Sequence, residues 1–165
     1  MGKNTKFLLA FRHRFWKSQG WAPSATLNGP VDQTWETTES YPKPDFGMVA
    51  FSGAAHADQL SKLTDAEART SVIGCLERVY KKTAHKLVGF EFANWPKQPW
   101  AWASYSFPNC GDIMKWGPRF SEGYKGKLHF AGEHTCYAFT GYMEGALQSG
   151  YRLARKLVLR DGGKW

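Results

Sequence analysis

The residues best suited to chemistry lie near the end of the chain, where glycine, acidic and aromatic residues follow one another in residues 132–145. Gly141 and Gly145 leave one side of the first turn of an expected helix without side-chain bulk, and Thr140 can cap that helix. The first N–H groups of a helix have no partner within it and lie at the positive end of its dipole. An electron-rich ligand could approach them closely, and a flavin ring fits because its pyrimidine side gains negative charge on reduction. The alternative is a glycine-bearing helix packed on a strand, since loose glycine patterns are common.

A change of periodicity would position this turn. Residues 127–132 alternate and predict a short buried strand that ends at Gly132. Residues 133–140 predict a polar and aromatic loop. From Gly141 onward the apolar residues follow the spacing of one helix face. The side chains expected to face inward are Met143, Ala146, Leu147, Gly150, Leu153, Ala154 and Leu157.

The part of the chain before this region predicts several strands and one helix. A capping box formed by Thr64 and Glu67 begins the helix, which is expected to run to about Lys82. The segment 109–124 is expected to be a loop that could contain a helical turn. This order of elements indicates an α/β or α+β fold. The expected strands cover residues 6–12, 31–38, 47–53, 86–93 and 101–107, and the inward side chains of the helix are Ala66, Ala68, Val72, Ile73, Leu76 and Val79.

Length and composition limit the function classes. A chain of 165 residues suits one ordinary domain or a piece of a larger one. Hydrophobic residues make up 42% of it and aromatic residues 16%, which favours a packed core over disorder. The net charge of +8 raises the alternative of a nucleic-acid-binding surface. The basic residues are scattered among Asp and Glu, however, so we expect a solvated basic surface and no nucleic-acid partner.

Cysteines and histidines give no sign of a metal site. Cys75, Cys110 and Cys136 lack metal or redox spacing, and their odd number argues against a disulfide framework. We expect Cys75 to be buried on a helix and His134 to form hydrogen bonds within its loop. No apolar run approaches the ~20 residues of a membrane span. The N-terminus shows no signal peptide, and the compartment stays open because Met1 could be an internal methionine.

The letters of the C-terminal region are specific. FAGEHT followed by GYMEGALQSGYR resembles the C-terminal signature of flavin-containing amine oxidases, which include monoamine, polyamine and L-amino-acid oxidases. The resemblance implies that the strand closes an FAD domain and that Glu133 contacts the ribityl–pyrophosphate part of FAD. It also implies that the backbone of Gly141 to Gly145 donates N–H groups to the flavin ring. The cofactor-binding residues implied in this way are Gly132, Glu133, Thr140, Gly141, Tyr142, Met143, Glu144 and Gly145.

The N-terminal stretch MGKNTKFLLAFRHRFW is similar to the same family. There, the lysine that opens the strand lies beside flavin N5, usually bridged by a water, and by position it is Lys6. A fixed positive charge stabilises the superoxide and peroxide that form when reduced flavin passes electrons to O2. The alternative is a solvated lysine at the start of a strand.

Two aromatic residues are candidates for the amine site. In monoamine oxidases two aromatic side chains flank the amine, and the matching positions are Tyr142 in the GYM turn and Tyr105 in SYSFP. The alternative is that both are core aromatics, and Trp100 and Trp102 could replace or supplement Tyr105. Ser104 stands where some family members carry the cysteine that bonds FAD, so the resemblance implies noncovalent FAD. The spacing before Phe107-Pro108 is shorter than in monoamine oxidases.

The resemblance covers only the C-terminal third of a usual family member. The GxGxxG fingerprint that binds the ADP half of FAD in this family is missing from the sequence. The fold it implies is α/β (α+β): residues 1–108 form the late part of a substrate domain with a mixed sheet. Residues 109–126 form a connecting loop, and residues 127–165 add the closing strand and C-terminal helix of the FAD domain. An N-terminal FAD-domain chain or a missing segment is the implied partner.

The function implied is oxidation of an amine or an L-amino acid to an imine. The Cα hydrogen leaves as hydride to flavin N5, the imine hydrolyses, and O2 is reduced to hydrogen peroxide. The implied catalytic residues are Lys6, Tyr105 and Tyr142. The alternative is a non-catalytic fragment or interaction module that needs an N-terminal partner chain to bind FAD, and the missing fingerprint favours it.

Overall fold

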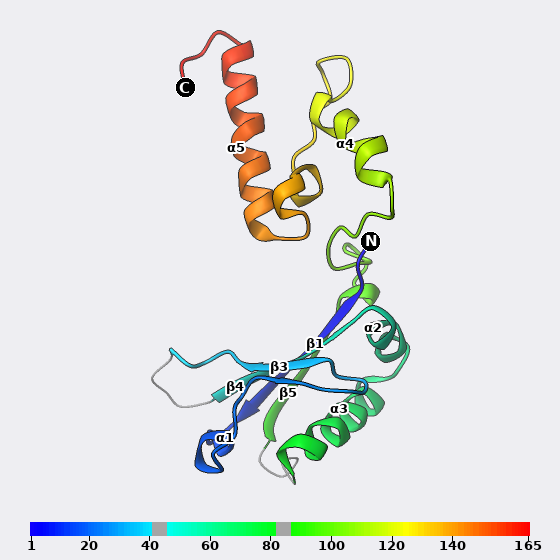
Figure 1. The fold of residues 1–165 in the computed structure, drawn as a ribbon, viewed down its shortest axis with the longest axis vertical. Helices are drawn as coiled ribbons and strands as arrows, with labels where there is room; N and C mark the ends of the chain where they lie inside the picture. The colour runs from blue at the N-terminus through cyan, green and yellow to red at the C-terminus, as the bar shows by residue number, and fades with distance from the viewer. Residues whose placement is uncertain (41–45, 82–86) are drawn as a thin grey trace. The chain divides into compact units, whose positions relative to one another are not determined.

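The computed structural model describes residues 1–40, 46–81 and 87–165. These residues form two compact units (Figure 1). One unit comprises Gly2–Ser104 and is called the sheet unit here. The other comprises Tyr105–Trp165 together with Met1 and is called the C-terminal unit.

The sheet unit is built on a five-stranded sheet with the strand order β2-β3-β4-β1-β5. The expected sheet is mixed, but every pairing among the described strands is antiparallel. Parallel neighbours need a crossover connection. Helices α2 and α3 connect β4 to β5, but β5 pairs with β1 and not with β4, so this connection places no parallel strands side by side. The combination of one sheet with helices confirms the α+β prediction. The strands are β1 (Asn4–Phe11), β2 (Ala25–Thr26), β3 (Gln33–Glu36), β4 (Phe46–Gly53) and β5 (Leu87–Asn94).

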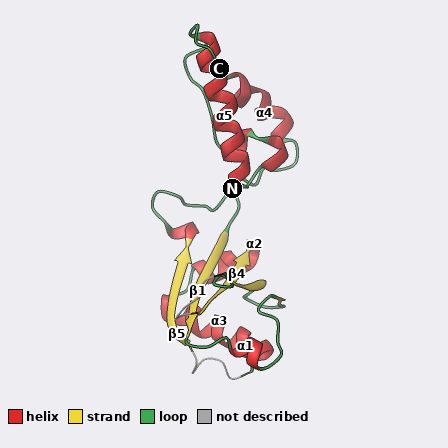
Figure 2. Cartoon of the chain, turned by 90° about the vertical axis from the view of Figure 1, so that its left-hand side faces the viewer, coloured by secondary structure: helices red, strands yellow, loops and turns green. Residues whose placement is uncertain are grey.

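One face of the sheet carries the hydrophobic core of this unit. Strand β1 lies between β4 and β5, and its alternate residues Phe7, Leu9 and Phe11 are buried on this face, as the pleat of a strand requires. They share the core with Val72 and Leu76 of helix α3 (Asp65–Tyr80), which lies beside the sheet (Figure 2). The short helix α1 (Phe15–Ser18) adds two further aromatic side chains to the same core. Burial of these side chains therefore fixes which residues of β1 point away from the core.

Helix α3 begins with the predicted capping box. The Thr64 side chain accepts a hydrogen bond from the Glu67 N–H, and the Glu67 carboxylate accepts one from the Thr64 N–H. The inward face differs in part from the expectation, because Ala66 and Val79 are exposed, while Cys75 is buried as expected. The predicted end of this helix, Lys82, and the predicted first residue of the next strand, Lys86, lie outside the described residues. Helix α2 (Ala54–Ser61) is not expected from the sequence.

The segment 101–107 does not form the expected strand. The N–H groups of Ala101 and Trp102 both donate to the carbonyl of Gln98, and Trp102 has a positive φ of 54°. These turns leave no extended run to pair with β5. The preceding residues form the short 3-10 helix η2 (Trp95–Lys97).

The C-terminal unit consists of helices and loops. The segment expected to be a connecting loop, 109–126, contains the helix α4 (Asp112–Glu122). Gly117 and Pro118 obscure this helix in the sequence, since both residues disfavour helix interiors. Gly117 is nevertheless buried against the ring of Tyr137, a close approach that only glycine permits. The remaining elements are the 3-10 helices η3 (Glu133–Thr135) and η4 (Tyr137–Phe139) and helix α5 (Met143–Arg160). The assignment of residues 1–108 and 127–165 to two functional domains stays a prediction.

The strand expected over residues 127–132 is not formed. An isolated bridge joins Leu128 to Tyr124, and no described residue of the C-terminal unit belongs to a named strand. A strand needs a neighbour to pair its backbone N–H and C=O groups. Residues 127–132 have no such neighbour among the described residues of this unit, so they form no strand despite their alternating pattern.

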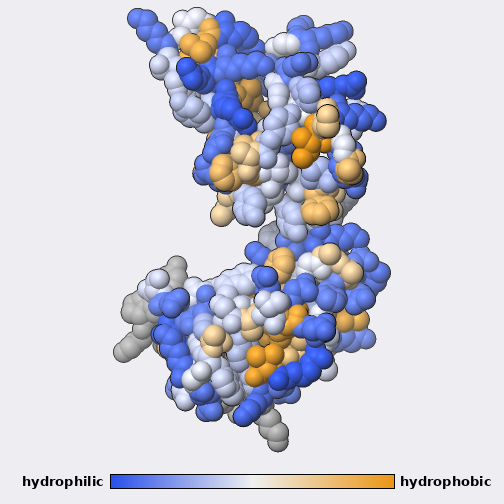
Figure 3. All heavy atoms as spheres, viewed as in Figure 1, coloured by the Kyte–Doolittle hydropathy of each residue, from blue (hydrophilic) through white to orange (hydrophobic). Residues whose placement is uncertain are grey.

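Helix α5 exposes most of the face that is expected to be buried. Met143 is 87% exposed and Leu147 is 70% exposed, whereas Gly145 and Ser149 are buried. Figure 3 shows apolar surface in orange over part of each unit. The described part of the chain contains no helix both long and apolar enough to cross a membrane.

Candidate functional site

Lys6 lies on β1, on the face of the sheet opposite the hydrophobic core. Its neighbour Phe7 is buried in that core, and successive side chains of a strand point to opposite faces. Its partners in register are Phe51 of β4 and Ala93 of β5. No described residue forms an ion pair or hydrogen bond with the Lys6 side chain, which is half-buried. Strand β1 thus carries a cation with no counter-ion among the described residues.

Glu133 joins two loops of the C-terminal unit. One carboxylate oxygen, Oε1, accepts a hydrogen bond from the Ser106 N–H at 2.8 Å. The other, Oε2, accepts one from the Gly141 N–H at 2.6 Å. We call this pair of hydrogen bonds the Glu133 clip. It ties together two segments that lie on either side of α4, η3 and η4 in the sequence.

The protonation state of Glu133 follows from these contacts. Partial burial is the largest single influence and by itself would raise the pKa of the carboxyl. The hydrogen bonds from Gly141 and Ser106 together outweigh it, with a further contribution from nearby His134, and the pKa is lowered. Glu133 is therefore a carboxylate at neutral pH, which suits an acceptor placed between two N–H donors.

The turn from Gly141 to Gly145 uses some of its N–H groups internally. Gly141 donates to Glu133, Tyr142 donates to the Phe139 carbonyl, and Gly145 donates to the Tyr142 carbonyl. The N–H groups of Met143 and Glu144 have no acceptor among the described residues. They are the first two N–H groups of α5, where the helix dipole is positive.

Thr140 does not cap α5, contrary to the prediction. The residue at the cap position is Tyr142, and its side chain makes no capping hydrogen bond. The Thr140 hydroxyl instead donates to the Cys136 carbonyl at 2.8 Å. Thr140 precedes the cap by two residues, too early for its hydroxyl to act as the cap. It therefore stabilises the loop before the helix and leaves the N–H groups of the first turn open.

The Glu133 clip brings the segments of the two predicted aromatic residues together. Tyr105 precedes Ser106, and Tyr142 follows Gly141. A Cβ placed on Gly141 would lie 3.7 Å from Cδ2 of Tyr105, so that ring lies beside the turn. Tyr105 is half-buried and Tyr142 is 68% exposed. Tyr142 is therefore a surface side chain of this chain rather than part of its core.

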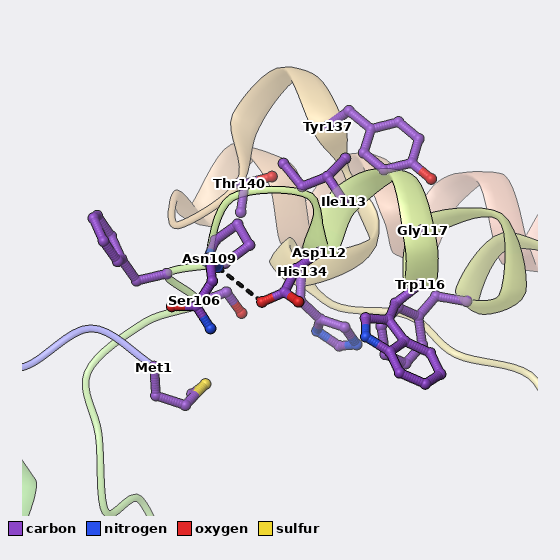
Figure 4. A pocket seen from close by; sticks show the side chains of 13 residues that line it. Met1, Ser106, Asn109, Asp112, Ile113, Trp116, Gly117, His134, Tyr137 and Thr140 are labelled. Atoms are coloured by element: carbon purple, nitrogen blue, oxygen red, sulfur yellow. Dashed lines mark hydrogen bonds between the residues drawn. The ribbon is translucent and has the colours of Figure 1, made fainter.

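A pocket of about 530 Å³ in the C-terminal unit is not predicted from the sequence (Figure 4). Ile113, Trp116 and Phe120 on α4 give it apolar lining, and Tyr137 and Thr140 also line it. The sequence signal that could have found it is the amphipathic spacing of these α4 residues, which the glycine and proline of that helix obscure. The polar residues of the pocket are Ser106, Asn109, Asp112 and His134, and the Asn109 N–H donates to the Asp112 carboxylate at 2.8 Å.

His134 lines this pocket and packs edge-to-face on Phe120, with ring centroids 5.5 Å apart. This ring contact replaces the expected hydrogen bonds of the His134 side chain. Among the described residues, no group of three or more His, Cys, Asp or Glu side chains could hold a metal ion. Cys75, Cys110 and Cys136 are all free, and Cys75 is buried on α3 as predicted.

The structure groups most of the predicted site residues in one unit. Gly132, Glu133 and the residues from Thr140 to Gly145 belong to the C-terminal unit, together with Tyr105. Lys6 belongs to the sheet unit. Their predicted roles stay predictions.

Residues 1–158 match the model of the family described as flavin containing amine oxidoreductase. A flavin-containing amine oxidase of Oncorhynchus mykiss is 30% identical over 171 residues, which cover 98% of this chain and 32% of the relative. Flavin-containing amine oxidase B of Cavia porcellus is 30% identical over 165 residues, covering 96% of this chain and 31% of the relative. The chain thus spans about a third of the length of these curated relatives.

Solved structures share the fold. A redesigned putrescine oxidase gives a TM-score of 0.87 at 21% identity, covering 97% of this chain and 36% of that chain. Cyclohexylamine oxidase from Brevibacterium oxydans gives a TM-score of 0.86 at 22% identity, with the same coverage of 97% and 36%. These identities carry the fold and no further property.

Proposed function

Because the chain belongs to the flavin containing amine oxidoreductase family, we propose that it is the C-terminal portion of an FAD-dependent amine or L-amino-acid oxidase. The proposed reaction oxidises an amine to an imine, and O2 is reduced to hydrogen peroxide. The observation that carries the proposal is the turn after Gly141, where two open N–H groups begin α5 beside the exposed ring of Tyr142. The chain spans about a third of its curated relatives, so the remaining cofactor contacts would come from a further segment or chain.

The residues present fit the flavin end of FAD. The Met143 and Glu144 N–H groups lack acceptors among the described residues, and a flavin ring offers oxygen and nitrogen acceptors along its pyrimidine edge. Gly141, at a φ of 86°, keeps a side chain away from this turn, whereas Gly145 is buried and packs on the Phe139 carbonyl. When bound, the flavin would supply the two-electron oxidation of the amine and the return of both electrons to O2.

A noncovalent flavin is consistent with Ser104. Its hydroxyl accepts a hydrogen bond from the Asn4 N–H at 2.9 Å and donates one to the Asn4 carbonyl at 3.4 Å. A serine lacks the thiolate that would bond the ring, and this hydroxyl is engaged with the start of β1. Ser104 therefore acts as a connector within the sheet unit in this proposal.

The remaining residues would handle charge and orientation. The Lys6 ammonium, without a counter-ion among the described residues, would stabilise the negative charge that develops on O2. The rings of Tyr142 and Tyr105 would flank the amine and orient its nitrogen. Aromatic faces exclude water from the amine, and this desolvation favours its unprotonated form.

The second candidate is an interaction module without catalysis of its own. Met143 and Leu147 on α5 are exposed, and a helix face of this kind is usually covered by a partner. The absence of a GxGxxG motif from the sequence favours the same reading. In this case the chain would dock on an N-terminal FAD-domain chain and complete its fold.

Co-expression tests the two candidates. The chain is produced alone and together with a candidate N-terminal FAD-domain chain, and flavin absorbance is recorded for both samples. Peroxide formation is then measured with a panel of primary amines, secondary amines and L-amino acids. Yellow protein that forms peroxide in the co-expressed sample supports the oxidase. Yellow protein without peroxide supports the docking module, and colourless protein in both samples contradicts flavin binding.

A further inference from the structure

The Glu133 carboxylate is held by the two segments that carry the proposed aromatic pair. Its Oε1 and Oε2 atoms lie 2.8 Å from the Ser106 nitrogen and 2.6 Å from the Gly141 nitrogen. Tyr105 and Tyr142 are the direct neighbours of these two donors in the chain. A shift of either donor would therefore move one ring relative to the other.

The backbone beneath Glu133 is itself anchored. The Gly132 N–H donates to the Ser149 hydroxyl on α5 at 2.8 Å, and the Gly132 carbonyl accepts from the Thr135 N–H and hydroxyl. Ser149 is buried, which keeps this attachment away from water. The side chain of Glu133 thus reaches out from a fixed point on the longest described helix.

We propose that Glu133 is a positioning residue, whose carboxylate holds the Ser106 and Gly141 backbones and so sets the separation of the Tyr105 and Tyr142 rings. The inference rests on the proposed function for the role of the two rings, and on geometry alone for the clip. It is separate from a cofactor contact, since each carboxylate oxygen accepts one backbone hydrogen bond within this chain and keeps a further lone pair.

Glu133→Gln separates the two roles. A glutamine amide can hydrogen-bond a ribityl hydroxyl about as well as a carboxylate can, because a hydroxyl both donates and accepts. Between two N–H donors the same amide must turn its NH2 group toward one of them, so one side of the clip is lost. If Glu133 acts through the clip, Glu133→Gln should change the Tyr105–Gly141 geometry and kcat/KM strongly. If Glu133 only contacts a cofactor hydroxyl, the same substitution should change them little.

The first test uses NMR on the full chain without flavin. In the unmutated chain, the Ser106 and Gly141 amide shifts should titrate together in acid with one midpoint, since protonation of Glu133 removes their acceptor. The nuclear Overhauser effect between the Tyr105 ring and the Gly141 Hα, which the 3.7 Å approach predicts, should weaken over the same range. In Glu133→Gln both amides should lose this titration, and the Overhauser effect should be weak at every pH.

Glu122→Gln is the matched control, because Glu122 is exposed in the same unit and its side chain has no partner among the described residues. Its spectra should keep both signals of the unmutated chain. If Ser106 and Gly141 do not titrate together in the unmutated chain, or if Glu133→Gln leaves the Overhauser effect intact, the clip is contradicted. The unmutated titration decides the question even if Glu133→Gln does not fold.

The second test uses the flavin-loaded, co-expressed protein with benzylamine as the probe. Glu133→Gln should lower kcat/KM by about tenfold or more at unchanged flavin content. Misplaced orienting groups slow the reaction of the amine but do not weaken the binding of flavin. Unchanged kcat/KM would contradict the positioning role. If neither protein binds flavin, the proposed function fails while the NMR result on the clip still stands.

Discussion

The carboxylate of Glu133 accepts a hydrogen bond from the Gly141 N–H at 2.6 Å, across a loop that contains η3 and η4. The contact places a negative charge directly before α5, where the helix dipole is positive. It also occupies the first N–H of the GYMEG turn and leaves those of Met143 and Glu144 for a ligand. Glu133 thus occupies one donor of the turn, while backbone carbonyls accept from Tyr142 and Gly145.

The stability of the C-terminal unit should depend on pH through Glu133. The pKa of this carboxyl is lowered in the folded chain from its ordinary value of 4.5, so its contribution to stability is complete above that value. The contribution is lost as the pH falls through the lower folded pKa. Urea midpoints at pH 6 and pH 3 should therefore show Glu133→Gln less stable than the unmutated chain at pH 6, with a smaller difference at pH 3. A difference that stays constant would contradict this linkage.

Two glycines of α5 should respond in opposite directions to alanine. A Cβ on Gly145 would strike the Phe139 carbonyl, so Gly145→Ala should destabilise the chain by about 1–3 kcal/mol and displace the turn. A Cβ on Gly150 would meet no atom within 4 Å, so Gly150→Ala should stabilise the helix by about 0.5–1 kcal/mol. Urea unfolding of both variants measures the difference, and equal effects would contradict the close packing of Gly145 on Phe139.

Replacement of Lys6 should affect the reaction with oxygen. Lys6→Met removes the cation on the open face of β1 and should slow flavin reoxidation by about 10²-fold while flavin content stays the same. Lys3→Met is the control, since Lys3 is paired with Asp58 at 2.6 Å and should change this rate little. Stopped-flow mixing of reduced, co-expressed protein with O2 gives both rates. Equal rates for the two variants would remove Lys6 from the mechanism.

The exposed tyrosine of the turn should matter for activity and not for stability. Tyr142 is 68% exposed, so Tyr142→Leu should change the free energy of unfolding by less than about 0.5 kcal/mol. It should nevertheless lower kcat/KM for benzylamine by about tenfold or more in the co-expressed protein. Tyr151→Leu, on the same helix and in contact with Trp165, is the control for loss of a surface ring. An activity loss shared by both variants would argue against a specific role for Tyr142.

Local patterns in the sequence predict much of the sheet unit. The apolar run after Lys6 becomes β1, and Thr64 with Glu67 forms the capping box of α3, because both signals act between near neighbours. The letters of residues 130–135 and 141–152 also identify the family, which the match over residues 1–158 confirms. Strand β1 and the capping box depend on side chains that meet within one strand or one helical turn.

The tertiary structure decided the features that depend on distant partners. Residues 127–132 have the alternation of a strand but form none, since pairing needs a second strand that the described residues of this unit do not provide. Helix α4 forms despite Gly117, because that glycine packs on Tyr137 from a later segment. The direction of the Glu133 carboxylate likewise depends on Ser106, separated from it by 27 positions. No local pattern encodes such a contact, because it exists only once the loops have been folded together.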